Sequence, residues 1–179
     1  ELQKKVGKTG FVLAVSSDHG AAALPEQAAA AHMTGGRILT DVLEKQLAEA
    51  ATAASDKKKR VLGVVPPHVF VDTTELSQAA RDKLLDALQA VLEKTEGISR
   101  VYRAPLVMSD PFAGFLAQSS YPGREGELMI ISRPRYIFSE TRYPSGTNHG
   151  TPNLYDRRVP FFLPGPGVRG GRYAAPVDP

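Results

Sequence analysis

Three residues of this sequence could take part in metal chemistry, and they stand in two short motifs. Asp18 and His19 follow the apolar run Phe11 to Val15, and His149 stands far later in a polar loop. One carboxylate and two imidazoles are standard zinc ligands. Zinc makes a phosphate ester reactive by polarising the phosphoryl oxygen and by stabilising the leaving oxygen. The residue types therefore suit a zinc site, although each motif by itself also fits an ordinary turn.

The elements next to these motifs would place them at the edge of a sheet. The run Phe11 to Val15 is continuously apolar, which predicts a strand buried on both of its faces. Ligands of open α/β sheets bind beyond the carboxyl ends of such strands. Val159 to Leu163 predicts a second short strand that could lie beside the first. Gly20 and Gly150 follow the two histidines and let the backbone turn sharply there.

The stretch between the motifs predicts a separate unit of helices and strands. Apolar residues recur at helical spacing from Ile38 to Ala54, which predicts one helix. A second helix is expected to run to about Lys94, with Thr73 or Thr74 as its cap. The expected strands are Arg60 to Asp72 (interrupted by Pro66 and Pro67), Ile98 to Val107 and Glu127 to Ser132, which Arg135 to Ser139 would continue. A short helix is expected from Pro111 to Gln118, with Asp110 as its cap. We therefore expect a small α+β subdomain at 35–139, inserted into a metal-binding α/β core made of 1–34 and 140–179.

Composition excludes several classes of function. The absence of cysteine rules out disulfides, thiolate zinc sites and cysteine nucleophiles. The 22 basic and 19 acidic residues leave a net charge of only +3, so no nucleic acid polymer is expected as a partner. The one basic run, Lys57 to Arg60, predicts a solvated connector more than an anion site. No apolar run approaches the roughly 20 residues of a membrane span. We assign structural roles to His32 and His68.

Two longer strings resemble the alkaline phosphatase superfamily, which includes the type I phosphodiesterase/nucleotide pyrophosphatases. They are Phe11-Val-Leu-Ala-Val-Ser-Ser-Asp-His-Gly20 and His149-Gly-Thr-Pro-Asn-Leu-Tyr-Asp-Arg-Arg-Val-Pro-Phe-Phe-Leu-Pro-Gly-Pro-Gly-Val168. The resemblance is greatest to the bacterial branch with a threonine nucleophile, in which Asp-His ends an apolar strand and His-Gly-Ser-Pro comes later. Thr151 replaces the common serine and Asn153 the common tyrosine. The implied fold is part of an α/β/α sandwich of the alkaline phosphatase type.

The resemblance also implies a role for each candidate residue. Asp18 and His19 would bind the zinc that holds the nucleophile's oxygen, and His149 would complete a second zinc on the phosphate side. The family's nucleophile and its Asp-x-x-x-His ligand pair would lie upstream of Glu1, so both ends of the chain look clipped. We expect a C-terminal part that holds a partial two-zinc site and is inactive by itself. The missing N-terminal half is then an expected partner, and self-association through exposed strand edges is another.

The resemblance leaves the substrate and the subclass open. A phosphomonoesterase or a phosphodiesterase/nucleotide pyrophosphatase acting on a small phosphate ester is expected, in the periplasm or secreted as relatives usually are. A cofactor-independent phosphoglycerate mutase is disfavoured because its later histidine follows the Asp-His pair closely. A sulfatase would need a modified Cys or Ser motif outside this chain. Two alternatives remain from other classes, a non-catalytic binding or interaction module and a degenerate family member.

Overall fold

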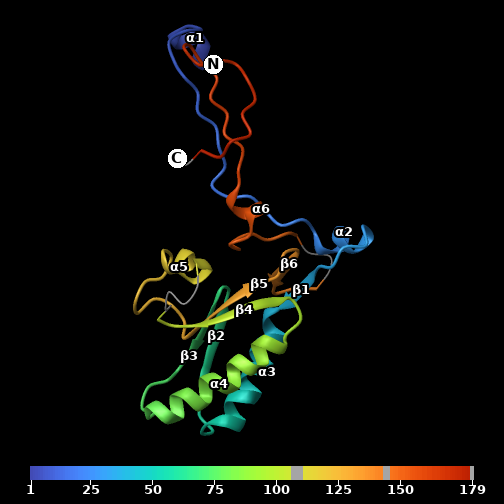
Figure 1. The fold of residues 1–179 in the computed structure, drawn as a ribbon, viewed down its shortest axis with the longest axis vertical. Coiled ribbons are helices and arrows are strands. Elements are labelled where there is room, and N and C mark those ends of the chain that lie inside the picture. The colour runs from blue at the N-terminus through green and yellow to red at the C-terminus, as the bar shows by residue number, and fades with distance from the viewer. Residues whose placement is uncertain (106–110, 143–145, 178–179) are drawn as a thin grey trace.

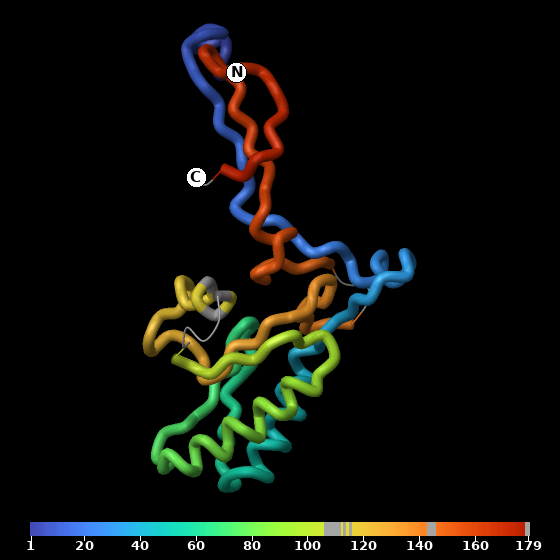
Figure 2. Tube along the Cα trace, viewed as in Figure 1, coloured from blue at the N-terminus to red at the C-terminus, as the bar shows by residue number. Residues whose placement is uncertain are grey.

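The structure is a computed structural model that describes residues 1–105, 111–142 and 146–177. These residues form a body of helices and strands and a long extension (Figure 1). We call this extension the stalk and define it as residues 1–20 and 158–177. Figure 2 shows that the two segments of the stalk run side by side although they lie at opposite ends of the sequence.

The centre of the body is an antiparallel sheet of four strands. The strands are β2 (Val61–Val65), β3 (His68–Val71), β4 (Ile98–Arg103) and β5 (Leu128–Ser132), in the spatial order β2-β3-β5-β4. Pro66 and Pro67 interrupt the strand, because proline cannot donate a hydrogen bond to a sheet. The chain reverses at these two residues and joins β2 to β3. The interrupted strand predicted from the sequence is therefore a hairpin.

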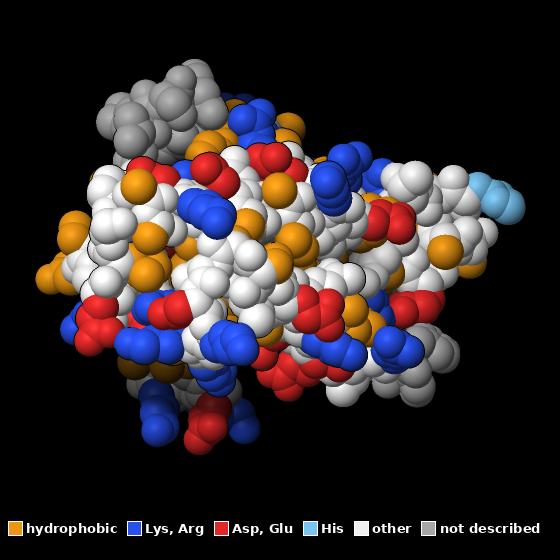
Figure 3. Space-filling view, turned by 90° about the horizontal axis from the view of Figure 1, so that it is seen from below, with side chains coloured by type: hydrophobic (Ala, Val, Ile, Leu, Met, Phe, Trp, Pro, Cys, Tyr) orange, Lys and Arg blue, Asp and Glu red, His pale blue; other side chains and the backbone are white. Residues whose placement is uncertain are grey.

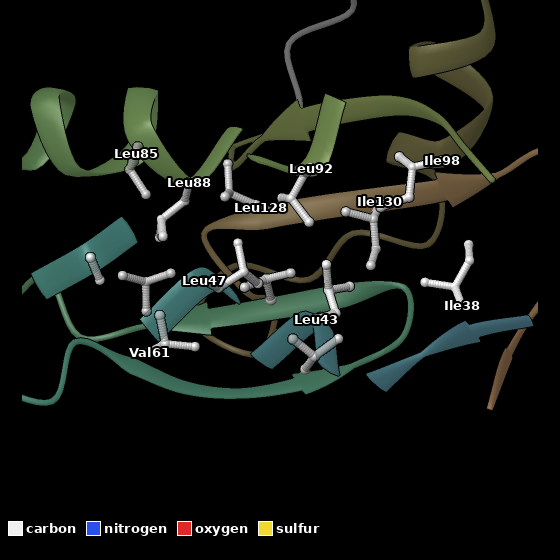
Figure 4. Packing of buried hydrophobic residues seen from close by; sticks show 14 of the residues in the cluster. Ile38, Leu43, Leu47, Val61, Leu85, Leu88, Leu92, Ile98, Leu128 and Ile130 are labelled. Carbon is white, nitrogen blue, oxygen red and sulfur yellow. The ribbon is translucent and has the colours of Figure 1, made fainter. Parts of the chain in front are cut away.

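Two long helices cover one face of this sheet. They are α3 (Thr40–Ala54) and α4 (Gln78–Lys94), and each has a buried row of leucines at helical spacing. Figure 4 shows the leucines of α4 pointing toward β5 and α3, so that the main core lies between the helices and the sheet. Leu47, Leu84 and Leu88 are fully buried there.

Strand β5 is buried on both of its faces. Leu128 and Ile130 belong to the main core, whereas Met129 and Ile131 point to the opposite side and pack with Leu116 of α5 (Pro111–Ala117). Side chains alternate between the faces of a strand, so a continuous apolar run needs cover on both sides. The body thus has three layers, with α3 and α4 on one face of the sheet and α5 on the other.

A second, two-stranded sheet corrects two expectations. Strand β1 (Gly36–Leu39) pairs in parallel with β6 (Tyr136–Ser139). Residues 38 and 39 are therefore strand and not the beginning of α3. The 135–139 segment does not continue β5, because Arg135 takes a φ of 67° and turns the chain into another sheet.

The helix ends differ from their predictions at two places. Helix α4 begins at Gln78, where Ser77 caps it by accepting a hydrogen bond from the Ala80 amide, so neither Thr73 nor Thr74 is its cap. The predicted cap of α5, Asp110, and the predicted end of the β4 strand at Val107 lie outside the described residues. The predicted helix at 111–118 is confirmed as α5.

The stalk contradicts the prediction of a buried strand at 11–15. Val15 and Phe162 form an isolated antiparallel bridge, and Leu13 donates to the Pro164 carbonyl at 2.9 Å. The side chains of Val12, Val15 and Phe162 are about half exposed. Only one neighbouring segment is present among the described residues, and a single ribbon cannot cover both faces of an apolar run. Of the short helices, α1 (Leu2–Val6) lies at the tip of the stalk and α6 (Leu154–Arg157) at its base, whereas α2 (Pro25–Ala30) lies beside β1 (Figure 1).

The surface carries both signs of charge. Figure 3 shows acidic and basic side chains interspersed over the visible face of the body, with apolar side chains between them. Within the basic run, Lys58 pairs with Glu75 at 2.7 Å, and Arg60 is buried and pairs with Asp56. None of the helices in the described part of the chain has the length and apolar character needed to cross a membrane.

Candidate functional site

The structure brings the two predicted motifs together at the base of the stalk. The imidazole rings of His19 and His149 stack with their centroids 3.5 Å apart and their planes 10° from parallel. Asp18 precedes His19, and its Oδ2 lies 3.8 Å from the Nε2 atom of His19. All three residues predicted to bind metal therefore lie in one place, although the apolar run before Asp18 is not buried.

The tautomer of His19 follows from its backbone partner. The Nδ1 atom of His19 lies 2.6 Å from the carbonyl oxygen of Gly20. A carbonyl can only accept, so Nδ1 carries the proton and donates it, and the neutral ring then has its lone pair on Nε2. A metal-ligating histidine commonly has this arrangement, in which one ring nitrogen is held by the backbone and the other is free to bind.

Asp18 is exposed and remains ionised to low pH. Hydrogen bonds from the backbone amides of Asp18 itself and of His19, together with the positive charge that His19 carries when its ring is protonated, hold the pKa of its carboxyl below the ordinary value. The His19 amide donates to Oδ1 at 3.1 Å, and the Ser17 hydroxyl donates to the same oxygen at 3.3 Å. A carboxylate that stays charged and exposed is suited to bind a cation.

Several hydrogen bonds hold the loop of His149 against the segment that follows His19. The Ala22 amide donates to the Asn148 carbonyl at 3.0 Å, and the Thr147 hydroxyl donates to the Ala22 carbonyl. On the other side of His149, the Gly20 amide donates to the Asp156 carbonyl at 2.8 Å. The two histidines thus lie between two points of contact.

The loop is also fastened to the body. The Asn148 side chain donates to the Phe138 carbonyl at 3.0 Å, and Arg37 donates to the Gly146 carbonyl at 3.1 Å. Arg37 is held in turn by Glu26, whose carboxylate it meets at 2.7 Å. Sequence reasoning did not single out Arg37, Asn148 or Asp156, because none of them stands in a pattern that metal chemistry requires.

A cleft of about 960 Å³ lies beside His149. Its walls come from the 146–152 loop, the ends of β5 and β6, α5 and the turn at Pro66 and Pro67. Apolar side chains such as Met129 and Ile131 line it together with polar ones such as Thr147 and Ser132. A cleft of this size can hold a small organic molecule.

The other two histidines lie apart from the pair. His32 is exposed at the end of α2. His68 lines the far wall of the cleft, where its Nδ1 accepts a hydrogen bond from the Gly126 amide at 3.4 Å. Partial burial lowers the pKa of His68, and Glu125 opposes that shift.

The candidate metal ligands Asp18, His19 and His149 are of the residue types that zinc prefers, but too few of them gather at one point to complete a site. Within the ranges that the structure describes, no three or more His, Cys, Asp or Glu side chains gather closely enough to hold a metal ion. A zinc site needs three or four protein ligands. The described residues would therefore supply part of a coordination shell.

Comparison with known proteins places this architecture. No protein-family model matches the chain. The crystal structure of the alkaline phosphatase PafA superposes with a TM-score of 0.77 at 24% identity, over 98% of this chain and 34% of that one. A mutant of the same enzyme gives a TM-score of 0.72. The predicted resemblance to the alkaline phosphatase superfamily is confirmed.

The curated relatives match nearly all of this chain and about a third of their own length. A protein of Myroides odoratus named calcium-transporting ATPase is 27% identical over 178 residues, which are 96% of this chain and 32% of that protein. The alkaline phosphatase PafA of Elizabethkingia meningoseptica is 24% identical over 98% of this chain and 33% of that protein. This chain spans about a third of the length of the curated relatives it matches. The mixed α/β fold of an alkaline phosphatase, present in part, is therefore confirmed.

Proposed function

We propose that this chain is the metal-binding C-terminal part of a zinc-dependent hydrolase of phosphate esters. Asp18 and His19 would bind one zinc ion, and His149 would bind a second. The observation that carries the proposal is the meeting of these residues, distant in sequence, with the two imidazoles 3.5 Å apart. The likeness of the fold to an alkaline phosphatase supports the same reading.

The chain's own residues would prepare the donors. Gly20 holds the Nδ1 proton of His19 and so leaves Nε2 available to a metal. Asp18 keeps its negative charge because its carboxylate accepts backbone and hydroxyl hydrogen bonds. Zinc bound there would supply positive charge that polarises the phosphoryl oxygen and stabilises the leaving oxygen. The cleft beside His149 has room for the organic group of the ester.

The division of labour within the whole protein is part of the proposal. The nucleophile and the remaining zinc ligands would come from outside this chain, which alone would be inactive. The metal-binding core would comprise 1–34 and 140–179, and the inserted subdomain 35–139. Export to the periplasm or the medium is proposed for the whole protein.

Metal binding by this chain is the direct test. Zinc is titrated into the ¹⁵N-labelled chain, and the imidazole resonances are followed by NMR. We expect the resonances of His19 and His149 to shift together and those of His32 to stay unchanged. The Asp18→Ala variant should weaken the response of His19. Equal shifts of all four histidines, or none at the pair, would contradict the proposal.

Catalysis is tested on the longest polypeptide that contains this sequence. The substrates are p-nitrophenyl phosphate, its bis-ester and ATP, the last because one relative is named an ATPase. We expect zinc-dependent hydrolysis that falls by more than about 100-fold in Asp18→Ala, since even the loss of an outer-shell partner costs up to that factor. His32→Ala is the matched control and should retain full activity. The preferred substrate then distinguishes a monoesterase from a diesterase.

An inert polypeptide would favour a different class. If zinc binds at the pair but no ester is hydrolysed, the chain is a degenerate family member that retains ligands. If zinc does not bind either, a non-catalytic binding module built on the body is the remaining reading. In that case the cleft at His149 and His68 would be the surface to examine.

A further inference from the structure

Asp156 is the one buried acidic residue among those described, and it lies where the string of His149 meets the segment that follows His19. Only 4% of its surface is exposed. Its carbonyl accepts from the Gly20 amide at 2.8 Å, one residue beyond His19. Its carboxylate holds Thr151, near His149 in the same string, so one residue contacts both the segment of His19 and the loop of His149.

The carboxylate holds Thr151 with two hydrogen bonds to one oxygen. Oδ2 of Asp156 accepts from the Thr151 amide at 2.7 Å and from the Thr151 hydroxyl at 2.6 Å. The Thr151 hydroxyl in turn accepts from the Asn153 side chain at 3.0 Å, and Asn153 also donates to the Tyr155 hydroxyl. Thr151 lies two residues after His149, so this network fixes the backbone that leaves the histidine.

The second carboxylate oxygen of Asp156 is buried without a hydrogen-bond partner. A buried acceptor without a donor lowers the stability of a fold, and such a group calls for an explanation. Stability alone would favour an apolar side chain of similar shape at this position. The carboxylate instead fixes Thr151 to the same residue whose backbone carbonyl holds the Gly20 amide, so the side chain ties the loop of His149 to the point where the two segments meet.

We propose that Asp156 is a positioning residue that sets the relative placement of His19 and His149. This inference rests on the proposed function, in which the two histidines bind metal. Asp156 fixes the loop on the C-terminal side of His149, while Thr147 and Asn148 fix the N-terminal side through Ala22. Removing the carboxylate frees one side only, so the rings separate while the rest of the fold remains.

The test compares Asp156→Leu with Asp156→Asn in the whole chain. The readouts are the nuclear Overhauser cross-peaks between the ring protons of the two histidines and the zinc-induced shifts of both rings. Leucine cannot hold Thr151, so we expect the cross-peaks to disappear and the zinc affinity to fall at least about 10-fold. The side-chain oxygen of asparagine can accept both Thr151 bonds, so this variant should retain both signals.

Two controls separate positioning from stability. Asp82→Leu makes the same change at an exposed site on α4 and should leave the cross-peaks intact. Thr151→Val removes one of the two bonds, so it should weaken the cross-peaks only in part. The body should melt at the wild-type temperature in every variant, because its core contains no residue of the loops.

The outcomes distinguish this inference from the proposed function. Loss of the cross-peaks in Asp156→Leu together with their retention in Asp156→Asn supports the positioning role. If zinc shifts neither ring in the wild-type chain, only the proposed zinc site is contradicted, and the positioning role still stands. Retention of the cross-peaks and of the wild-type zinc response in Asp156→Leu would overturn the inference. Wild-type protein without the cross-peaks would overturn it as well.

Discussion

Gly20 is the residue at which the stalk base tolerates no side chain. A Cβ built on Gly20 would lie far inside the van der Waals radius of the Tyr155 carbonyl oxygen, which is backbone and cannot swing away. The amide of the same residue donates to Asp156 at 2.8 Å. Close approach of two backbones explains why glycine follows His19 here, and it gives the Asp-His-Gly motif a packing role beside any chemical one.

We therefore expect Gly20→Ala to displace α6 from the His19 segment. Overpacking of this kind typically costs about 1–3 kcal/mol. The stacking of His19 on His149 should weaken, which the ring cross-peaks would report. Gly170→Ala is the matched control, because nothing lies within 4 Å of a Cβ at that position. Unchanged cross-peaks in the Gly20→Ala variant would show that the loops adjust and that the close approach does not hold the histidines.

Arg60 joins two acidic residues at the edge of the sheet and makes stability depend on pH. Its guanidinium is buried and meets Asp56 at 2.7 Å and Asp72 at 3.6 Å. The hydrogen bond from Arg60 lowers the pKa of Asp56 below the ordinary 3.8, and bonds from Thr74 lower that of Asp72. As pH falls below about 4, the unfolded chain takes up these protons before the folded chain does.

The stabilising effect is thus present above the unfolded pKa and is lost as pH falls through the folded values. We expect the urea midpoint of the body to fall between pH 5 and pH 2, and to fall less in Asp56→Asn than in the wild type. Asp41→Asn, an exposed site on α3, is the control and should leave the slope of the wild type. An Asp56→Asn slope equal to that of the wild type would show that this pair contributes nothing.

The elements that periodicity defines best were those that the sequence predicted best. The leucines of α4 recur at helical spacing and are buried against β5, and β5 is apolar from Leu128 to Ile131. The run at 11–15 is likewise apolar and was expected to be buried, yet most of it is exposed. An apolar composition predicts that both faces of a strand should be buried, but whether neighbouring elements are present to bury them depends on the rest of the fold.

Element ends and partners were harder to predict because they depend on contacts outside each segment. Ser77 caps α4 although two threonines upstream can also cap a helix, and β6 pairs with β1 from far earlier in the chain. The candidate ligands could be proposed from the sequence because zinc requires particular side chains. Asp156 and Asn148 were missed because their side chains hydrogen-bond to groups that only the folded loops bring near, and such contacts leave no recognisable spacing in the sequence.

Helix α4 should be the element on which the body depends most. Leu88 of α4 is fully buried in the core that this helix forms with α3 and the sheet. Leu88→Ala removes its apolar contacts and leaves a cavity, which costs about 2–5 kcal/mol of unfolding free energy. The control Leu62→Ala truncates the same side chain at an exposed position on β2 and should cost under about 0.5 kcal/mol. Urea denaturation followed by far-UV circular dichroism measures both. Equal costs for the two variants would contradict this packing.

The molecule as a whole divides into a body with a core and a stalk without one. Every residue of the main cluster lies between Ile38 and Phe138. The described residues of the stalk instead expose large apolar side chains, among them Val12, Leu13, Val15, Phe161, Phe162 and Leu163. Exposed apolar surface of this extent on one ribbon marks a contact surface. In the proposed function, the rest of the metal-binding core would cover it.

The isolated chain should accordingly associate through the stalk. We expect a concentration-dependent increase in mass by light scattering and strong binding of an apolar dye, because water-exposed apolar surface drives both. The double variant Val12→Lys with Phe162→Lys should reduce both signals while the body keeps its melting temperature. Leu62→Lys places the same charge on the exposed face of β2 and should leave the association unchanged. If the chain stays monomeric at high concentration, or if Leu62→Lys alone abolishes the association, then the stalk is not the contact surface and the uncovered ribbon needs another explanation.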